Sequence, residues 1–221
     1  ATGVSEGAYA GATLRRTVAL VAVPGRAAPP CLVDFTTAAS SKEHTFDWLW
    51  HNRGELRAGE AADAPALGKG HGYQHLEKPR RAADPGAPVD WVLPEGGVRL
   101  WTAVPPAERF LAEGMGQPPS EAIPVVLDRA RGTAAVFARV IEPYRGRPAI
   151  RGVRVLDVSL DGKPAPAGNA LALEIDRGEE KDVVLLAPGL QGEKSAAGIA
   201  TTRQAALVVR RAGRETLREE K

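Results

Sequence analysis

The chain has 221 residues, with 29 Lys and Arg against 27 Asp and Glu, so its formal net charge is +2. A dedicated nucleic-acid-binding domain usually carries a strong or clustered basic excess, and this near balance argues against that class. The hydrophobic fraction of 43% is sufficient for a packed core, while 24 Gly and 18 Pro, spread along the chain, favour many turns over long helices. These features predict an all-β fold.

The sequence gives no sign of a membrane or export segment. It has no run of about 18 apolar residues, and its N-terminus lacks the order of a signal peptide. Because the sequence begins at Ala1 and its one methionine is Met115, we expect either a removed presequence or the C-terminal part of a longer protein. The single cysteine, Cys31, allows no internal disulfide, and its apolar neighbours predict a buried structural thiol.

The predicted elements follow one another as short β-strands. Leu14–Val23 and Cys31–Thr37 are the first two, and residues 52–88, rich in Gly, Ala, Pro and charge, predict long connections. Apolar runs bounded by turn residues predict eight more strands: Val89–Leu93, Val98–Val104, Ile123–Leu127, Thr133–Ile141, Gly152–Leu160, Asn169–Ile175, Asp182–Leu186 and Gln204–Arg210.

The turn residues support hairpins between these strands. Turn residues at Pro94–Gly97, Asp161–Pro164 and Asp176–Gly178 separate these strands, and the Gly-Gly and Asp-Gly steps in the first two are hairpin signals. Ten or more short strands with no long amphipathic helix predict one antiparallel β-sandwich domain over residues 1–221. We expect the charged residues 211–221 to form a solvated tail, with a short helix as the alternative.

All four histidines and all four tryptophans lie between His44 and Trp101. On a strand, Phe46, Trp48 and Trp50 would share one face, while Asp47, Leu49 and His51 would share the other. Aromatic rings beside imidazole and carboxylate groups would suit a sugar ring. The alternative, which we favour for the aromatic residues, is that they fill the core between two sheets.

A second group contains His71, Tyr73 and His75 at positions i, i+2 and i+4. On a strand the three would project from one face and could serve proton transfer or sugar contacts; a solvated loop edge explains them equally well. The glycan-contact hypothesis therefore covers six residues in the two groups: His44, Trp48, His51, His71, Tyr73 and His75.

A metal site is a weaker hypothesis. Imidazole and carboxylate groups suit zinc, but His44 and His51 are seven residues apart and would lie on opposite faces of a regular strand, so a site that includes Asp47 would need a bulge or turn. The sequence also has no GxSxG elbow, HExxH motif, P-loop or GxGxxG opening a helix. We therefore predict no metal site and no catalytic residue in this chain.

Several segments, taken in order, match a known pattern: Arg15–Val21 leading into Leu32–Phe35, then His44–His51, and finally Phe137–Ile150. The last segment looks like F-x-x-V-x-E-P-Y-x-G-x-P-x-I and is the most specific. Together they resemble the C-terminal β-sandwich of heparinase II/III-like polysaccharide lyases, including their alginate-lyase relatives. Within the last segment we expect Pro143 to end strand pairing and Tyr144 to bury its ring at the sandwich edge.

In that family an N-terminal α-helical toroid supplies a Tyr and His set for proton abstraction, completed by an H-x-H motif and zinc ligands at the start of the sandwich. Here no H-x-H-x-D segment precedes Leu14, no HN motif precedes Arg15, and the pair His51-Asn52 follows the wrong strand. We therefore do not assign the family zinc role to any residue, and we expect no cofactor in this chain.

The resemblance implies part of an enzyme that cleaves uronate-containing acidic glycans by β-elimination. This sandwich would support the toroid and line the cleft without being catalytic alone. Its expected partners are an acidic polysaccharide and the missing N-terminal toroid, not nucleic acid or a membrane, and its expected location is periplasmic or secreted. A stand-alone carbohydrate-binding module and a purely structural β domain are the alternatives.

Overall fold

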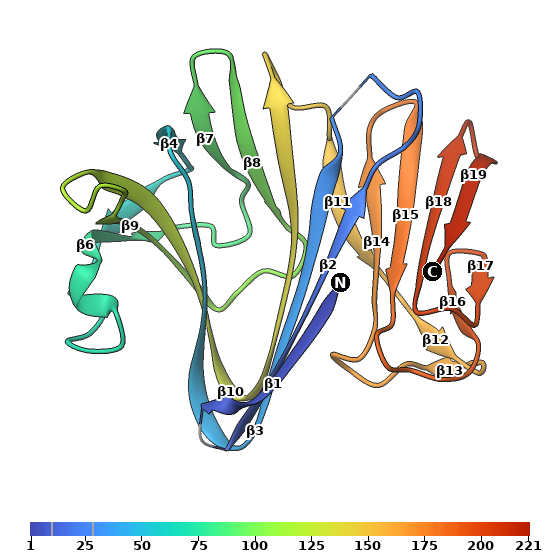
Figure 1. The fold of residues 1–221 in the computed structure, drawn as a ribbon, viewed down its shortest axis with the longest axis horizontal. Helices are drawn as coiled ribbons and strands as arrows, with labels where there is room; N and C mark the ends of the chain where they lie inside the picture. Colours follow the sequence, from blue (N-terminus) through green and yellow to red (C-terminus); the bar gives the residue numbers. More distant parts are fainter. Residues whose placement is uncertain (10, 28) are drawn as a thin grey trace.

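The computed structural model describes residues 1–9, 11–27 and 29–221, which form nineteen β-strands and one short 3-10 turn. The strands build three antiparallel sheets, which confirms the all-β class and the sandwich (Figure 1). In the same described ranges, we find no helix long and apolar enough to cross a membrane.

Sheet A is the largest, and it includes every strand of the first two thirds of the chain. The turn η1 (Tyr73–His75) lies between its fifth and sixth strands. Its ten strands are β1 (Thr2–Tyr9), β2 (Ala12–Val21), β3 (Cys31–His51), β4 (Glu55–Arg57), β5 (Ala61–Asp63), β6 (Glu77–Ala82), β7 (Val89–Leu93), β8 (Gly96–Thr102), β9 (Glu108–Met115) and β10 (Ala122–Arg145).

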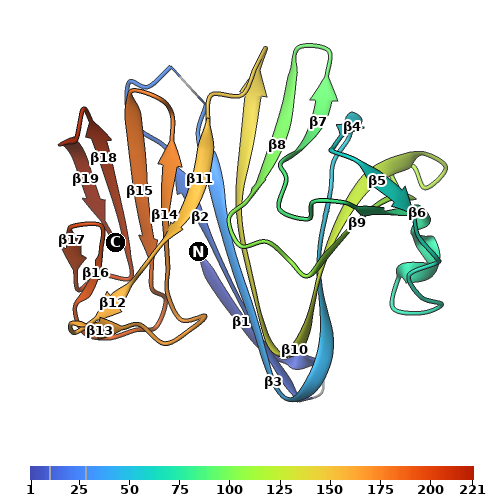
Figure 2. The same cartoon turned by 180° about the vertical axis from the view of Figure 1, so that it is seen from behind.

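Sheet A is folded into a V, because its two longest strands bend together (Figures 1 and 2). β3 has 21 residues and β10 has 24, and they pair over most of their lengths. Their register shifts between Gly132 and Ala134, and Gly132 has a φ of 137°, a conformation that favours glycine. The prediction of only short strands is therefore wrong for β3 and β10.

The bend divides sheet A into two limbs. The sandwich limb contains residues 31–40 of β3 and 134–145 of β10, flanked by β1 and β2 on one side and by β8, β7 and β4 on the other. The outer limb contains residues 44–51 of β3 and 122–132 of β10, followed by β9, β6 and β5. Three of these strands, β4, β5 and β6, lie in the region predicted as connections.

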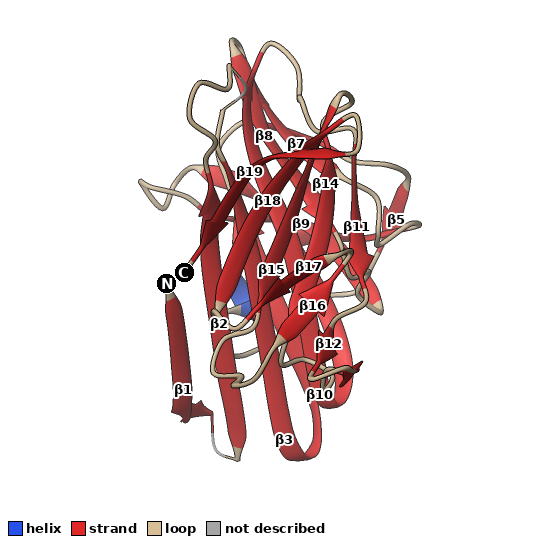
Figure 3. Cartoon of the chain, turned by 90° about the vertical axis from the view of Figure 1, so that its right-hand side faces the viewer, coloured by secondary structure: helices blue, strands red, loops and turns tan. Residues whose placement is uncertain are grey.

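Sheets B and C follow in the last third of the chain. Sheet B packs on the sandwich limb, and Figure 3 shows it from its own side, in front of the long strands. Sheet B contains β11 (Gly152–Leu156), β14 (Leu171–Asp176), β15 (Glu180–Leu186), β18 (Ala205–Arg211) and β19 (Arg214–Glu220). Sheet C contains β12 (Ser159–Leu160), β13 (Lys163–Pro164), β16 (Lys194–Ala196) and β17 (Ile199–Thr201).

The predicted solvated tail at residues 211–221 is wrong, because β19 pairs with β18. Ala212 and Gly213 have φ values of 48° and 78°, the two positive angles of a type I′ hairpin turn. The charged side chains misled the prediction, since an edge strand exposes them as readily as a tail does. The turn predicted at Asp161–Pro164 is confirmed at Asp161 and Gly162, which connect β12 to β13.

Alternation along the strands produces three apolar cores. Within the V, Trp48 and Phe137 pack with residues of both limbs. Between the sandwich limb and sheet B, the core includes Phe35 and Ile175. A third core lies between sheet B and sheet C and includes Val183. The outer limb extends away from the sandwich, so one of its faces lines the V and the other faces away from it.

Pro143 and Tyr144 partly follow expectation. Pairing of β10 with β3 ends at Ile141, before Pro143, while pairing with β8 continues to Arg145. Proline has no backbone N–H to donate. Position 143 tolerates a proline because β3 has already ended there, so no hydrogen bond to β3 is lost. Tyr144 is half-buried, and its ring lies so close to Gly97 that a Cβ atom there would be 2.7 Å from the Tyr144 hydroxyl.

Candidate functional site

The second histidine group does not lie on a strand, so of the two alternatives the shared face of His71, Tyr73 and His75 is wrong and the loop edge is confirmed for the two histidines. His71 and Gly72 have φ values of 57° and 90°, which turn the chain into η1. His71 and His75 are exposed, as a loop edge would be. The turn belongs to residues 64–76, here called the strap, which crosses the face of the outer limb that points away from the V.

Tyr73 fixes the strap to this face. Its hydroxyl donates a hydrogen bond to a carboxylate oxygen of Asp47 on β3. Arg129 of β10 donates to both oxygens of the same carboxylate, at 2.8 and 2.7 Å. The Arg129 guanidinium also lies 5.7 Å from the centre of the Tyr73 ring and 5.4 Å from that of Phe110. Strap, β3, β9 and β10 therefore meet in one cluster.

The electrostatics of this cluster keep the phenol protonated. Burial raises the pKa of Tyr73 to about 12, and the hydrogen bond to the Asp47 carboxylate acts in the same direction. The Asp47 carboxylate in turn raises the pKa of Arg129. Tyr73 is consequently a hydrogen-bond donor at neutral pH and not a base.

The first histidine group divides between core and surface. Trp48 is 6% exposed and stacks on Trp50 with ring centres 6.0 Å apart inside the V. Trp48 is therefore a core residue, as expected, although its core lies between the two limbs of sheet A and not between two sheets, and the expected glycan contact by this buried indole is wrong. His44 and His51 are exposed. In the part of the chain that is described, no group of three or more His, Cys, Asp or Glu lies close enough together to hold a metal ion.

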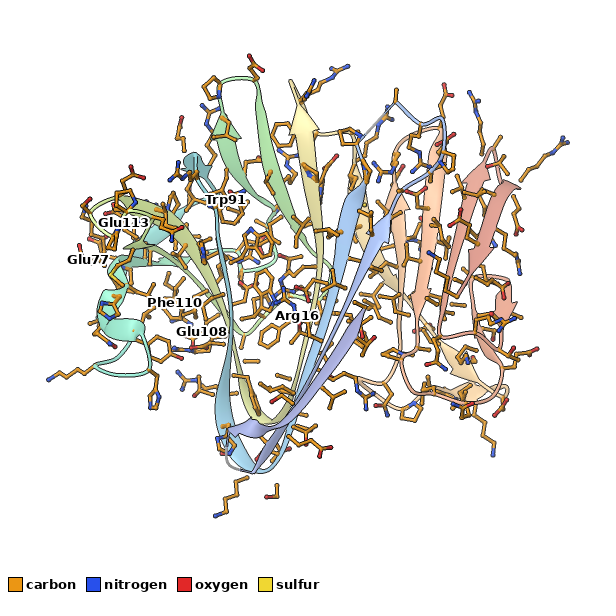
Figure 4. The ribbon with its side chains drawn as sticks, in the orientation of Figure 1. Arg16, Glu77, Trp91, Glu108, Phe110 and Glu113 are labelled. Atoms are coloured by element: carbon orange, nitrogen blue, oxygen red, sulfur yellow. The ribbon has the colours of Figure 1, made fainter. Side chains whose placement is uncertain are left out.

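An open groove of about 850 Å³ runs beside the strap on the same face of the outer limb. Residues 60–67 form one wall, and Pro85 and Ala107 belong to the other. Phe110 and Arg129 contribute to its floor, which places the groove next to the Tyr73 cluster. Figure 4 shows Phe110 on the outer limb, away from the interior of the V.

A row of charged side chains crosses the groove. Arg81 of β6, Glu108 of β9 and Arg131 of β10 lie on three adjacent strands and line this space. Nη2 of Arg81 lies 3.1 Å from one carboxylate oxygen of Glu108, and Nη2 of Arg131 lies 3.3 Å from the other. The arginine side chains are 59% and 67% exposed and that of Glu108 is 17% exposed, so both guanidinium groups are open to a ligand.

Another ion cluster is structural. Asp128 accepts hydrogen bonds from Arg109 and Arg139 inside the V, and all three side chains are at most 1% exposed. Burial lowers the pKa of Arg139, although the Asp128 carboxylate acts in the opposite direction. A ligand in solvent has no access to these groups.

Sequence reasoning found Tyr73 but missed its partners and the groove. Asp47 and Arg129 are 82 residues apart in the chain, and Glu108 and Arg131 are 23 apart. The alternation of His44–His51 placed Asp47 on the face opposite the aromatic residues, which was the one available signal. A comparison of the sequence with protein-family models finds no match, and one with curated proteins finds none of significant similarity.

Proposed function

We propose that this chain is a non-catalytic β-sandwich that binds an acidic glycan in the groove of its outer limb, as part of a heparinase II/III-like polysaccharide lyase. The observation that carries the proposal is the row Arg81–Glu108–Arg131 across an open groove. The pair of guanidinium groups already holds one carboxylate, that of Glu108, and a uronate presents the same group. The motif resemblance at Phe137–Ile150 supports the lyase class.

The size and lining of the groove support a sugar ligand. Its volume of about 850 Å³ falls within the range of roughly 300–1,000 Å³ that is common for small-molecule sites. Alanine and proline side chains give apolar walls, while arginine and carboxylate groups give directional hydrogen bonds. Sugars offer both apolar C–H faces and hydroxyl groups, so a short stretch of a polysaccharide matches this lining.

The chemistry of the cluster supports a binding role over catalysis. β-Elimination from a uronate needs a base for the proton next to the carboxylate, donors for the developing charge and an acid for the leaving oxygen. Tyr73 is held protonated against Asp47, and Arg129 is committed to the same carboxylate. These groups position the strap, and the chemistry is assigned to a separate catalytic domain.

The test is a binding titration of the purified chain. Isothermal calorimetry with a uronate oligosaccharide should show binding that weakens as salt rises, because exposed charges are screened. Arg131→Ala should weaken binding, while Arg154→Ala, which removes an exposed arginine from an ion pair on sheet B, should leave it unchanged. Ultraviolet detection of unsaturated uronate should show no product. Absence of binding, or robust turnover by this chain alone, would contradict the proposal.

The alternative of a stand-alone carbohydrate-binding module predicts the same binding. The coding sequence upstream of Ala1 separates the two: a helical region with Tyr and His residues and an H-x-H strand would support the lyase, whereas a signal peptide directly upstream would support the separate module.

A further inference from the structure

We infer that Glu108 is a built-in competitor, a carboxylate that occupies the two groove arginines and sets how tightly the groove binds an acidic ligand. This inference rests on the proposed function, since it concerns the same groove. It assigns Glu108 a role in specificity and predicts the sign of its effect on affinity: removal of the Glu108 charge should strengthen the binding of acidic ligands.

The strand register of sheet A brings the side chains of Arg81, Glu108 and Arg131 together. Arg81 is the cross-strand neighbour of Phe110, and Arg129 is the neighbour of Glu108. Glu108 lies two residues from Phe110, and Arg131 lies two residues from Arg129, so all of them share one face. Glu108 therefore sits diagonally between Arg81 and Arg131, on the central strand of the three, and its two oxygens serve one arginine each.

The charges of the groove depend on this carboxylate. The lining contains three arginines and three acidic residues, so its formal charges cancel: Arg81, Arg129 and Arg131 against Glu60, Asp63 and Glu108. A polyanion is consequently not drawn to the groove by net charge, and its carboxylate competes with that of Glu108 for the two exposed arginines. Neutralising Glu108 leaves an excess of one positive charge and two arginines without this partner.

A ligand carboxylate can take the place of the Glu108 carboxylate, because Arg81 and Arg131 are exposed. Ion pairs between exposed side chains are weak, because water screens them and holding long side chains in place costs entropy. A ligand carboxylate can displace Glu108 without disrupting the sheet, since Phe110 and Arg129 beneath it keep their own contacts. Replacement of Glu108 by neutral Gln should then raise the affinity for a carboxylate ligand by about three- to tenfold.

The matched control is Glu113 of the same strand. Glu113 is bridged by Lys78 at 2.9 Å and does not line the groove. Figure 4 shows Glu108 and Glu113 at separate places on the outer limb. Glu113→Gln changes the net charge of the protein as Glu108→Gln does, so it controls for charge alone.

The experiment compares wild type, Glu108→Gln and Glu113→Gln by calorimetry, with a trigalacturonate and with its methyl-esterified, uncharged form as probes. Tighter binding of trigalacturonate by Glu108→Gln alone, with the neutral probe unchanged, is the expected result. Equal affinity of Glu108→Gln and wild type for trigalacturonate would overturn this inference and leave the proposed function intact. An equal gain in Glu113→Gln would also overturn it, and absence of binding by all three proteins would overturn both proposals.

Discussion

The hydroxyl of Tyr73 donates a hydrogen bond to the carboxylate of Asp47, 26 residues earlier in the chain. Asp47 lies on β3 of the outer limb and is also held by Arg129, so the bond joins an irregular strap to a rigid sheet. The strap continues into one wall of the groove at residues 64–67. The position of that wall therefore depends on the tyrosine.

Tyr73→Phe should loosen the strap more than it weakens the fold. Loss of a hydrogen bond to a charged carboxylate costs about 1.5–3 kcal/mol of unfolding free energy, and the low end applies here because Asp47 keeps both bonds from Arg129. Limited trypsin digestion should cut after Lys69 faster in the variant than in wild type, while chemical denaturation should show a loss near that low end. His71→Ala, at an exposed strap position, is the control. Equal cleavage rates in Tyr73→Phe and wild type would show that the hydroxyl does not hold the strap.

The alkaline titration of Tyr73 should be delayed. Burial and the Asp47 carboxylate raise its pKa to about 12 from an ordinary value of 10.0. Because the folded state favours the protonated phenol, this stabilising contribution is present below pH 10 and is lost as the pH rises through about 12. Absorbance of tyrosinate should therefore show a late phase that disappears in Tyr73→Phe. If every tyrosine instead titrated with a pKa near 10, the hydrogen bond between Tyr73 and the Asp47 carboxylate would be contradicted.

The fold class and the positions of ten of the nineteen strands were predictable, because alternation and turn residues are local, whereas others, among them β9 of the groove, were not predicted. The V was not predictable: its bend at Gly132 depends on the pairing of β10 with β3 on both sides of it, and that pairing joins residues from 74 (Val125 and His51) to 109 (Ile141 and Leu32) positions apart. Asp47 could be assigned to a face by alternation. Its partner Arg129 could not, since cross-strand register decides that pair. Its partner Tyr73 could not either, since Tyr73 lies in the strap and not on a strand.

Asp128→Asn should be strongly destabilising. The substitution leaves the guanidinium groups of Arg109 and Arg139 in the V without a counter-charge, and breaking a buried pair in this way costs about 3–5 kcal/mol. Asp90→Asn is the control, since its pair with Arg99 is partly exposed, at 16% and 27%. Urea denaturation should show a much larger loss for Asp128→Asn. Similar losses in both variants would contradict the role assigned to the buried cluster.

Glu142→Gln should loosen the turn after β10. Glu142 is 2% exposed and accepts hydrogen bonds from Trp101 and from the backbone of Ala149 and Ile150, at 2.9, 2.6 and 2.8 Å. Glutamine has one acceptor oxygen, so its amide group must face one of these donors. A cost of roughly 1.5–3 kcal/mol is expected, because hydrogen bonds to a charged acceptor are lost. Chemical denaturation followed by tryptophan fluorescence measures it, with the exposed Glu95→Gln as control.

Cys31 should be unreactive until the protein unfolds. Its side chain is fully buried between the sandwich limb and sheet B, and burial raises the pKa of the thiol to about 11 from 9.0, although Arg177 acts in the opposite direction. The folded state favours the protonated thiol, so this stabilising contribution is present below pH 9 and is lost as the pH rises through about 11. At neutral pH both access and the thiolate fraction are therefore low.

A disulfide reagent such as DTNB tests this directly. Labelling of the native protein at neutral pH should be slow and should follow the rate of unfolding as denaturant is added, whereas the unfolded chain should react at once with one thiol per molecule. Rapid labelling under native conditions, with the fold retained by circular dichroism, would mean that Cys31 reaches solvent without unfolding. The core between the sandwich limb and sheet B would then open locally, against the packing of Val33, Cys31 and Ile175.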